Sequence, residues 1–187
     1  MAKASAKKAE SLFDRVLSHG EVDSVTLQRT RHQKMLLLVQ QGRGHEAVDA
    51  AHQWLAYDET AADNWICVVA AYQYCDRFAE AYEWFQKATE RFPDRLNLYI
   101  FGGDICSRLG KKQEALEYWD RALLSDSNFY DATYSKVFFY EAEGNYQSAY
   151  ALRIRIAKRL RNDGYDVEAA AEEEKAEACL HKERTKE

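Results

Sequence analysis

The sequence predicts an all-α fold built from repeated pairs of helices, and three observations support this prediction. Proline and glycine, the residues that interrupt helices, supply only 1 and 8 of the 187 residues, well below their usual combined share of about 12%. Alanine recurs every 34 residues, at Ala47, Ala81, Ala115 and Ala149. Five residues before each alanine stands a turn-forming residue: Gly42, Asp76, Gly110 or Gly144. A constant period of this length is typical of repeat architectures.

A short amphipathic helix is predicted ahead of the repeats. Between residues 9 and 17, the apolar side chains share one helical face: Ala9, Leu12, Phe13, Val16 and Leu17. The 34-residue period then divides the chain into the blocks 28–61, 62–95, 96–129 and 130–163. We therefore expect residues 1–27 to form a capping helix and a linker, and residues 28–163 to hold four helix-turn-helix repeats.

The second block shows why each repeat needs two helices. Its first helix carries apolar side chains at the spacing of one helical face: Trp65, Val68, Val69 and Tyr72. Its second helix has a stripe that alternates small and aromatic side chains before Pro93 ends it: Phe78, Ala81, Phe85, Ala88 and Phe92. The small alanines allow the two helices to approach closely, and the aromatic rings fill the angle between them.

The outer blocks depart from this pattern. The first block has Arg31 where an aromatic residue is expected, and the fourth has Thr133, Lys136 and Arg153 at normally apolar positions. After Gly164 the chain is rich in alanine and glutamate, which predicts a C-terminal capping helix within residues 164–187. Because the ends of a repeat array need a polar outer face, we expect the polar residues of the fourth block to serve that purpose.

The repeat resembles the tetratricopeptide repeat (TPR) family over residues 28–163. The family pattern W-x2-L-G-x2-Y, A-x3-F and P is matched in the second block by Trp65, Tyr72, Ala81, Phe85 and Pro93. In the third block it is matched by Tyr99, Gly103, Ala115, Trp119 and Ala122. The resemblance implies a right-handed superhelical solenoid of helix-turn-helix repeats with flanking capping helices.

The resemblance also implies a concave groove, lined by the first helix of each repeat, that binds a peptide or a partner helix. The positions that would line it give an apolar strip of Leu36, Ile66, Ile100, Phe101, Tyr134 and Phe138. The same face also carries His32, Ala70, Tyr74, Asp63, Asp104, Arg108, Asp131 and Glu141. We expect it to hold an apolar peptide or amphipathic helix of another protein. A terminal helix of the same chain or a second copy are the alternative occupants.

One TPR subclass is excluded. TPR proteins that clamp the C-terminal carboxylate of heat-shock chaperones use lysine, asparagine and arginine side chains. In the register that starts at the first block, the corresponding residues are His32, Leu36, Cys67, Asn97 and Phe101. The register that starts at the second block does not match either, so a carboxylate-clamp co-chaperone is not expected.

A basic segment offers a second function. Five cations lie within nine residues of the last repeat helix: Arg153, Arg155, Lys158, Arg159 and Arg161. They could bind nucleic acid or an anionic membrane. Alternatively, they complement the C-terminal helix dipole and the acidic run Glu172–Glu174 folds back onto them. The net charge of −5 argues against nucleic-acid binding by the chain as a whole.

No catalytic motif is present. The glycines lack the GxGxxG and GxxxxGK[ST] contexts, and no serine lies in GxSxG. His45, Asp49 and His52 fall at i, i+4 and i+7 and could supply metal ligands, but nothing in the sequence indicates a supporting second shell. We therefore expect a non-catalytic adaptor, scaffold or chaperone-like protein without a metal or cofactor.

The sequence also favours a cytoplasmic location. The longest apolar run, residues 65–72, is far shorter than the ~20 residues of a membrane span. The first ten residues contain lysines but no apolar stretch of the kind found in secretory signals. The four cysteines show no CxxC spacing, and free thiols suit a reducing compartment.

Overall fold

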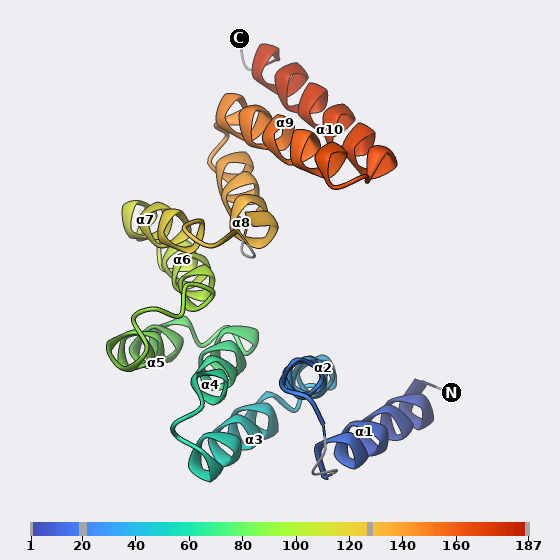
Figure 1. Ribbon diagram of the computed structural model, residues 1–187, viewed down its shortest axis with the longest axis vertical. Helices are drawn as coiled ribbons and strands as arrows, with labels where there is room; N and C mark the ends of the chain where they lie inside the picture. Colours follow the sequence, from blue (N-terminus) through green and yellow to red (C-terminus); the bar gives the residue numbers. More distant parts are fainter. Residues whose placement is uncertain (1, 19–21, 127–128, 186–187) are drawn as a thin grey trace. The chain divides into compact units, whose positions relative to one another are not determined.

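The computed structural model describes residues 2–18, 22–126 and 129–185, and its regular elements in these ranges are all α-helices (Figure 1). They are α1 (Ala2–Ser18), α2 (Ser24–Gln40), α3 (Gly44–Tyr57), α4 (Ala62–Tyr74), α5 (Phe78–Arg91), α6 (Leu98–Arg108), α7 (Lys112–Ala122), α8 (Phe129–Ala142), α9 (Tyr146–Asn162) and α10 (Asp166–Arg184). The predicted all-α class is confirmed. The two helices expected in each block are α2–α3, α4–α5, α6–α7 and α8–α9, with α1 and α10 outside them.

The turn inside each helix pair has the same hydrogen bond. A backbone N–H donates to a carbonyl five residues earlier in four places, over 2.8–3.0 Å: Arg43 to Leu38, Arg77 to Tyr72, Lys111 to Cys106 and Asn145 to Tyr140. The residue before each donor has a positive φ: 73° for Gly42, 56° for Asp76, 75° for Gly110 and 71° for Gly144. This is the Schellman arrangement that ends many helices. The period seen in the sequence is therefore the period of one helix-ending turn.

The chain divides into two compact units, residues 1–101 and 102–187, and the boundary falls within α6. In the first unit, α1 packs on α2, and α4 contacts α2, α3 and α5. The core of this unit is formed by Met35, Leu38, Ala47, Val48, Ala51, Leu55, Cys67, Val68, Ala70 and Ala71. The periodic alanines Ala47 and Ala81 are both fully buried, which is what close helix packing requires.

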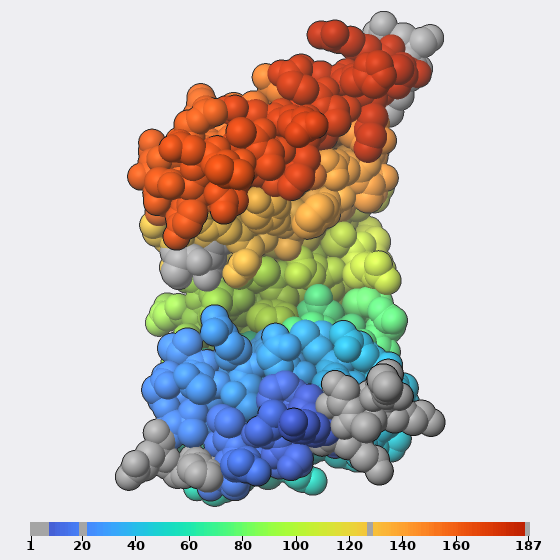
Figure 2. All heavy atoms as spheres, turned by 90° about the vertical axis from the view of Figure 1, so that its right-hand side faces the viewer, coloured from blue at the N-terminus to red at the C-terminus, as the bar shows by residue number. Residues whose placement is uncertain are grey.

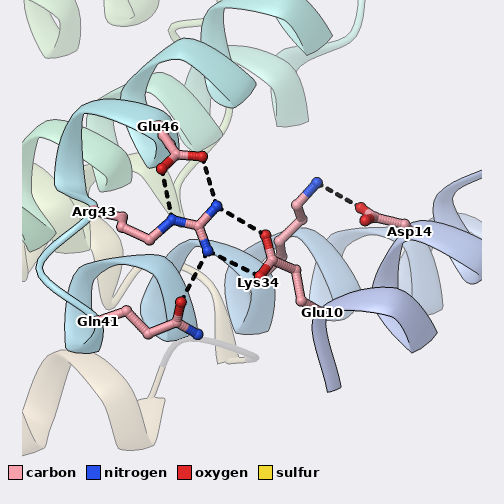
Figure 3. Close-up of polar contacts among 6 residues, drawn as sticks. All are labelled: Glu10, Asp14, Lys34, Gln41, Arg43 and Glu46. Carbon is pink, nitrogen blue, oxygen red and sulfur yellow. Dashed lines mark hydrogen bonds and ion pairs between the residues drawn. The ribbon is translucent and has the colours of Figure 1, made fainter. Parts of the chain in front are cut away.

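Helix α1 is attached to the first repeat by an arginine whose donors are all engaged. Arg43 lies in the turn between α2 and α3 and donates to Glu46 over 2.6 and 2.6 Å (Figure 3). It also donates to Glu10 of α1 over 2.9 and 3.1 Å, and to Gln41 over 2.9 Å. These bonds use the five N–H groups that a guanidinium offers. Arg43 therefore fixes α1, α2 and α3 to one another.

A second ion pair and a partly covered apolar face complete the attachment of α1. Lys34 of α2 donates to Asp14 over 2.7 Å (Figure 3). Phe13 and Val16 are half-buried, whereas Leu12 is 49% exposed. In the space-filling view the dark blue atoms of α1 lie against the lighter blue atoms of the helices that follow (Figure 2).

In the second unit, α10 lies along α9 (Figures 1 and 2). The core between α8 and α9 contains Phe129, Val137 and Ile156. The side chains that α10 buries are small or charged: Ala169, Glu172, Ala176 and Cys179. Helix α10 therefore contributes little large apolar surface to its contact with α9.

A close contact between α6 and α7 explains why a glycine stands at position 103 of the repeat pattern. Trp119 is 1% exposed, and its Nε1 donates to Asp104 over 2.9 Å. A Cβ added to Gly103 would lie 2.4 Å from Trp119 Nε1, closer than real atoms approach. Gly103 is therefore needed because Trp119 occupies the aromatic position of the repeat.

The polar residues of the fourth block do not form a polar outer face, contrary to the expectation from the sequence. Arg153 is 6% exposed and Thr133 is fully buried. Arg153 donates to Glu141 of α8 over 2.9 and 3.0 Å and to Glu172 of α10 over 2.6 Å. The reason is that α10 covers this surface and brings its own carboxylate to it.

Candidate functional site

In the first unit, three residues predicted to line the groove lie close together. They come from the first helix of each helix pair: His32 from α2, Tyr74 from α4 and Phe101 from α6. We call these residues the aromatic cluster of the first unit. His32 Nδ1 lies 3.0 Å from the Tyr74 hydroxyl, within hydrogen-bonding distance. The imidazole meets the Tyr74 ring edge-on with centroids 6.1 Å apart, and the Phe101 ring at 6.3 Å.

The aromatic cluster is uncharged near neutral pH. Burial lowers the pKa of His32 below its ordinary value of 6.5, and the nearby Asp63 carboxylate opposes this only in part. All three rings remain partly exposed. The cluster therefore presents flat apolar surface with a polar edge, the combination that recurs in protein-binding surfaces.

Other residues of the predicted strip in this unit lie at different depths. Leu36 and Ile100 are half-buried. Ile66 is 3% exposed and Ala70 is fully buried. The reason is that α4 is the central helix of this unit, contacted by α2, α3 and α5. Ile66 and Ala70 therefore support the surface from beneath.

In the second unit, Tyr134 and Phe138 of α8 form a stacked pair, which we call the aromatic pair of the second unit. Their ring centroids are 6.2 Å apart with an interplanar angle of 21°. Phe138 is 60% exposed, whereas the adjacent Phe139 is 9% exposed. Burial, and then the charge and hydrogen bond of Glu172, raise the pKa of Tyr134. Helix α10 therefore flanks the pair at Tyr134 and leaves Phe138 open to solvent.

The remaining predicted residues of the second unit have separate roles. Asp104 accepts the indole hydrogen bond of Trp119, so it supports the core. Arg108 is exposed at the end of α6. Glu141 accepts from Arg153 and lies 3.3 Å from Cys179 Sγ of α10. At this end of the predicted groove face, Glu141 therefore contacts α10.

Comparison with known proteins settles the fold. No protein-family model matches the sequence, and no curated protein matches it significantly. Among solved structures, the TPR protein TTC0263 of Thermus thermophilus matches with a TM-score of 0.69 and 17% identity, covering 94% of this chain and 92% of that one. This chain has the TPR fold.

Two further TPR-like structures agree. A tetratricopeptide repeat protein from Parabacteroides merdae matches with a TM-score of 0.60 and 12% identity, covering 97% of this chain and 69% of that one. A MamA protein matches with a TM-score of 0.52 and 20% identity, covering 86% and 92%. At these identities the likeness concerns the fold alone.

The structure does not assemble His45, Asp49 and His52 of the first TPR into one site. His45 and Asp49 lie on α3 without a shared partner, and Asp49 is exposed. His52 is half-buried, with Nε2 3.1 Å from the Tyr72 hydroxyl and its ring 5.0 Å from the Trp84 ring. In the described ranges, no group of three histidine, cysteine or acidic side chains could hold a metal ion.

The basic segment of the last TPR is largely paired with carboxylates, as the fold-back of the acidic tail requires. Besides the buried Arg153, Arg161 donates to Glu173 over 2.5 and 2.6 Å. Arg159 donates to Asp126 over 2.7 and 2.6 Å. Three cations of this segment are exposed: Arg155, Lys158 and the paired Arg161.

Within the described part of this TPR chain, no helix is long and apolar enough to cross a membrane. The four cysteines are free thiols. Burial raises the pKa of Cys67 to about 12 and that of Cys106 to about 11. Both thiols are therefore protonated and unreactive near neutral pH.

Proposed function

We propose that this chain is a non-catalytic protein–protein interaction module, an adaptor, scaffold or chaperone-like TPR protein. It holds an apolar peptide or an amphipathic helix of another protein on the face of its first helices. The observation that carries this proposal is Phe138, which is 60% exposed and stacked on Tyr134. Exposed apolar side chains that gather on one face mark interaction sites.

The aromatic cluster of the first unit supports the same function. His32, Tyr74 and Phe101 come from three successive first helices and keep part of their surface exposed. Rings on successive helices suit a ligand whose apolar side chains recur along an extended peptide or one face of a helix. The neutral imidazole of His32 adds a hydrogen-bonding group without adding a charge.

The test is capture of partner proteins with a matched pair of variants. Phe138→Asp places a charge on the proposed surface, and Tyr57→Asp does the same at an aromatic residue that is 89% exposed at the end of α3. Affinity capture from the native host, followed by mass spectrometry, should recover the same proteins with the wild type and Tyr57→Asp. Phe138→Asp should lose them.

A second variant tests the first unit. Adding Phe101→Asp to Phe138→Asp should abolish any residual capture, but Phe101 packs against the core, so circular dichroism must show that the helices persist. Unchanged capture by a folded double variant would refute the assignment of this face. A dimer of the chain that Phe138→Asp dissolves would show that a second copy is the occupant.

The alternative is nucleic-acid association through the segment 153–161. Its support is weaker because Arg153, Arg159 and Arg161 already pair with carboxylates. Partner capture that falls steeply between 50 and 200 mM salt, by about tenfold or more, would favour this alternative. Capture that survives high salt favours the apolar face. A cytoplasmic location is part of the proposal, since the free thiols suit a reducing compartment.

A further inference from the structure

We propose that the second unit carries a separate binding site for a phosphate monoester attached to a small apolar group. A hollow of about 310 Å³ lies beside α9 and the segment that follows α7. The polar side chains that line it from α9 are Arg155, Lys158, Arg159 and Asn162, and its apolar edge is Leu123 and Phe129. None of these residues belongs to the aromatic pair of the second unit.

The spacing along α9 directs the donors to one place. Arg155, Lys158, Arg159 and Asn162 stand at i, i+3, i+4 and i+7, so they share one helical face. Together a guanidinium, an ammonium and a carboxamide offer donors from successive turns. An oxyanion in the hollow can therefore accept from more than one of them at once.

One wall of the hollow is fixed in place. Phe129 is 8% exposed, and the guanidinium carbons of Arg155 and Arg159 lie 5.0 and 5.5 Å from its ring centroid. Arg159 is held by two bonds to Asp126 and by a 3.2 Å bond to Asp163. The buried Phe129 ring and the hydrogen-bonded Arg159 guanidinium hold this wall of the hollow in place without a ligand.

The charge of the hollow selects the kind of anion. Asp126 and Asp163 both pair with Arg159, and their two negative charges exceed its one positive charge. Among the described residues, no carboxylate pairs with Arg155 or Lys158. The three cations and two carboxylates leave a net charge of +1, and the donors of Arg155 and Lys158 suit a phosphate monoester, which carries about −1.5 to −2 at pH 7 and three acceptor oxygens.

The surroundings disfavour a long polyanion. Asp126 lines the hollow and Asp163 stands beside Arg159, and these carboxylates would repel the further phosphates of a nucleic acid. Leu123, which is half-buried, instead offers apolar surface to the group that carries the phosphate, and the buried Phe129 ring lies behind the guanidinium groups. A phosphorylated side chain of a partner protein and a small phosphorylated molecule share this chemistry.

Titration of the full chain with four probes tests the site. Phenyl phosphate is expected to bind at least tenfold more tightly than inorganic phosphate or phenylacetate, and to shift the amide NMR signals of α9. A ten-nucleotide single strand of thymidine should bind more weakly than phenyl phosphate. Tighter binding of the oligonucleotide, or equal binding of inorganic phosphate, would overturn the proposal.

A matched pair of double variants assigns the binding to the hollow. Arg155→Gln with Lys158→Gln should weaken phenyl phosphate binding at least tenfold, and both side chains are exposed, so the fold should persist. Lys8→Gln with Arg29→Gln removes the same two charges from exposed positions on α1 and α2 and should change nothing. Equal losses in both double variants, or no loss in either, would refute the site.

A phosphotyrosine peptide identifies the source of the ligand. Binding of the peptide at least tenfold tighter than phenyl phosphate, lost in Arg155→Gln with Lys158→Gln, supports a phosphorylated partner protein. Binding weaker than that of phenyl phosphate, with the same variant dependence, supports a small phosphorylated molecule. Peptide affinity that is the same in the double variant as in the wild type would contradict the proposed site.

Discussion

At the residue scale, the turns within the helix pairs differ in one side chain. Among the described residues, Asp76 is the non-glycine residue with a positive φ, 56°, and it stands where the other three turns have glycine. The left-handed region costs an L-residue about 1–2 kcal/mol, less for aspartate and asparagine. The second repeat therefore keeps a strained residue at its turn.

Replacing this residue should stabilise the chain. Asp76→Gly is expected to raise the free energy of unfolding by about 1 kcal/mol, because glycine adopts a positive φ without steric cost. Urea unfolding followed by circular dichroism measures the change. Gly110→Asp, the reverse change in the equivalent turn at φ 75°, should destabilise the chain, and a stabilising effect there would contradict the argument.

A second residue-scale prediction concerns Gly103. Gly103→Ala should destabilise the chain by about 1–3 kcal/mol, the usual cost of overpacking, because its Cβ would lie 2.4 Å from Trp119 Nε1. The measurement is a double-mutant cycle with Trp119→Phe by urea unfolding. If the clash is the cause, the double variant loses less than the sum of the single variants. Strict additivity would show that Trp119 is not responsible.

The sequence predicts these residues well where local chemistry decides the outcome. The positions of Gly42, Gly110 and Gly144 follow from the backbone of a helix-ending turn, which depends on its own residues. His52 shows the limit of this reasoning. Its spacing from His45 suggests an outward metal ligand, yet its ring packs against Tyr72 and Trp84, side chains of α4 and α5.

At the element scale, α10 depends on charges more than on apolar packing. Arg153 and Glu172 are 6% and 3% exposed and are joined over 2.6 Å. Burial acts to raise the pKa of Glu172, but the hydrogen bonds of Lys175 and Arg153 outweigh it and lower the pKa. This carboxylate therefore stabilises the docked helix at neutral pH, and its contribution is lost as the pH falls below its ordinary value of 4.5.

Removing this carboxylate should release α10. Glu172→Ala is expected to cost about 3 kcal/mol, the low end for breaking a buried ion pair, because Arg153 keeps Glu141 as a partner. Hydrogen exchange of residues 166–184 should accelerate. Glu173→Ala removes a carboxylate one residue away that pairs with Arg161 at the surface, and it should change the exchange little. Equal acceleration of hydrogen exchange in the two variants would show that burial of the ion pair does not determine how much it stabilises α10.

The helices themselves follow from the sequence pattern, whereas their partners do not. The apolar stripes of the second and third blocks predict α4 to α7 because each stripe reflects one helix and its nearest neighbour. The acidic run and the basic segment suggest that the tail folds back, but the 34-residue pattern does not say which carboxylate meets Arg153, because Glu172 lies outside it. For the same reason, the burial of Ile66 and Ala70 could not be read from α4 alone, since α2, α3 and α5 together cover it.

At the scale of the whole molecule, two histidines link stability to pH. Burial lowers the pKa of both His32 and His52 below 6.5. Asp63 and Asp49 respectively oppose the effect, and Arg77 adds to it at His52. Because the unfolded chain then takes up protons first, the stability is fully present above pH 6.5 and declines as the pH falls below it.

Substitution of these histidines should flatten this pH dependence. His32→Gln with His52→Gln is expected to show a smaller loss of the urea midpoint than the wild type between pH 7.5 and 5.5. His45→Gln, at a position on α3 outside both ring contacts, is the matched control and should leave the wild-type slope unchanged. A double variant with the full wild-type slope would mean that other groups carry the effect.

The candidate site shows what a repeat pattern can and cannot supply. Register along the first helices predicts that Tyr74 and Phe101 share a face, because they are the thirteenth and sixth residues of their blocks and so differ by seven residues, about two helical turns. The pattern undervalues His32, because imidazole is not counted as apolar, although its ring joins the other two. The signal would have been that His32, the fifth residue of its block, stands at a groove-lining position like Tyr74 and Phe101.

The buried ion pair of α10 also determines the alignment of that helix. The buried alanines Ala169 and Ala176 stand seven residues apart, so a slide of α10 along α9 by two turns would bring one to the place of the other. Such a slide moves Glu172 by about 10.5 Å and leaves Arg153 without it in a buried place. The buried pair thus favours one alignment of α10 over another, as a buried polar residue does in a coiled coil.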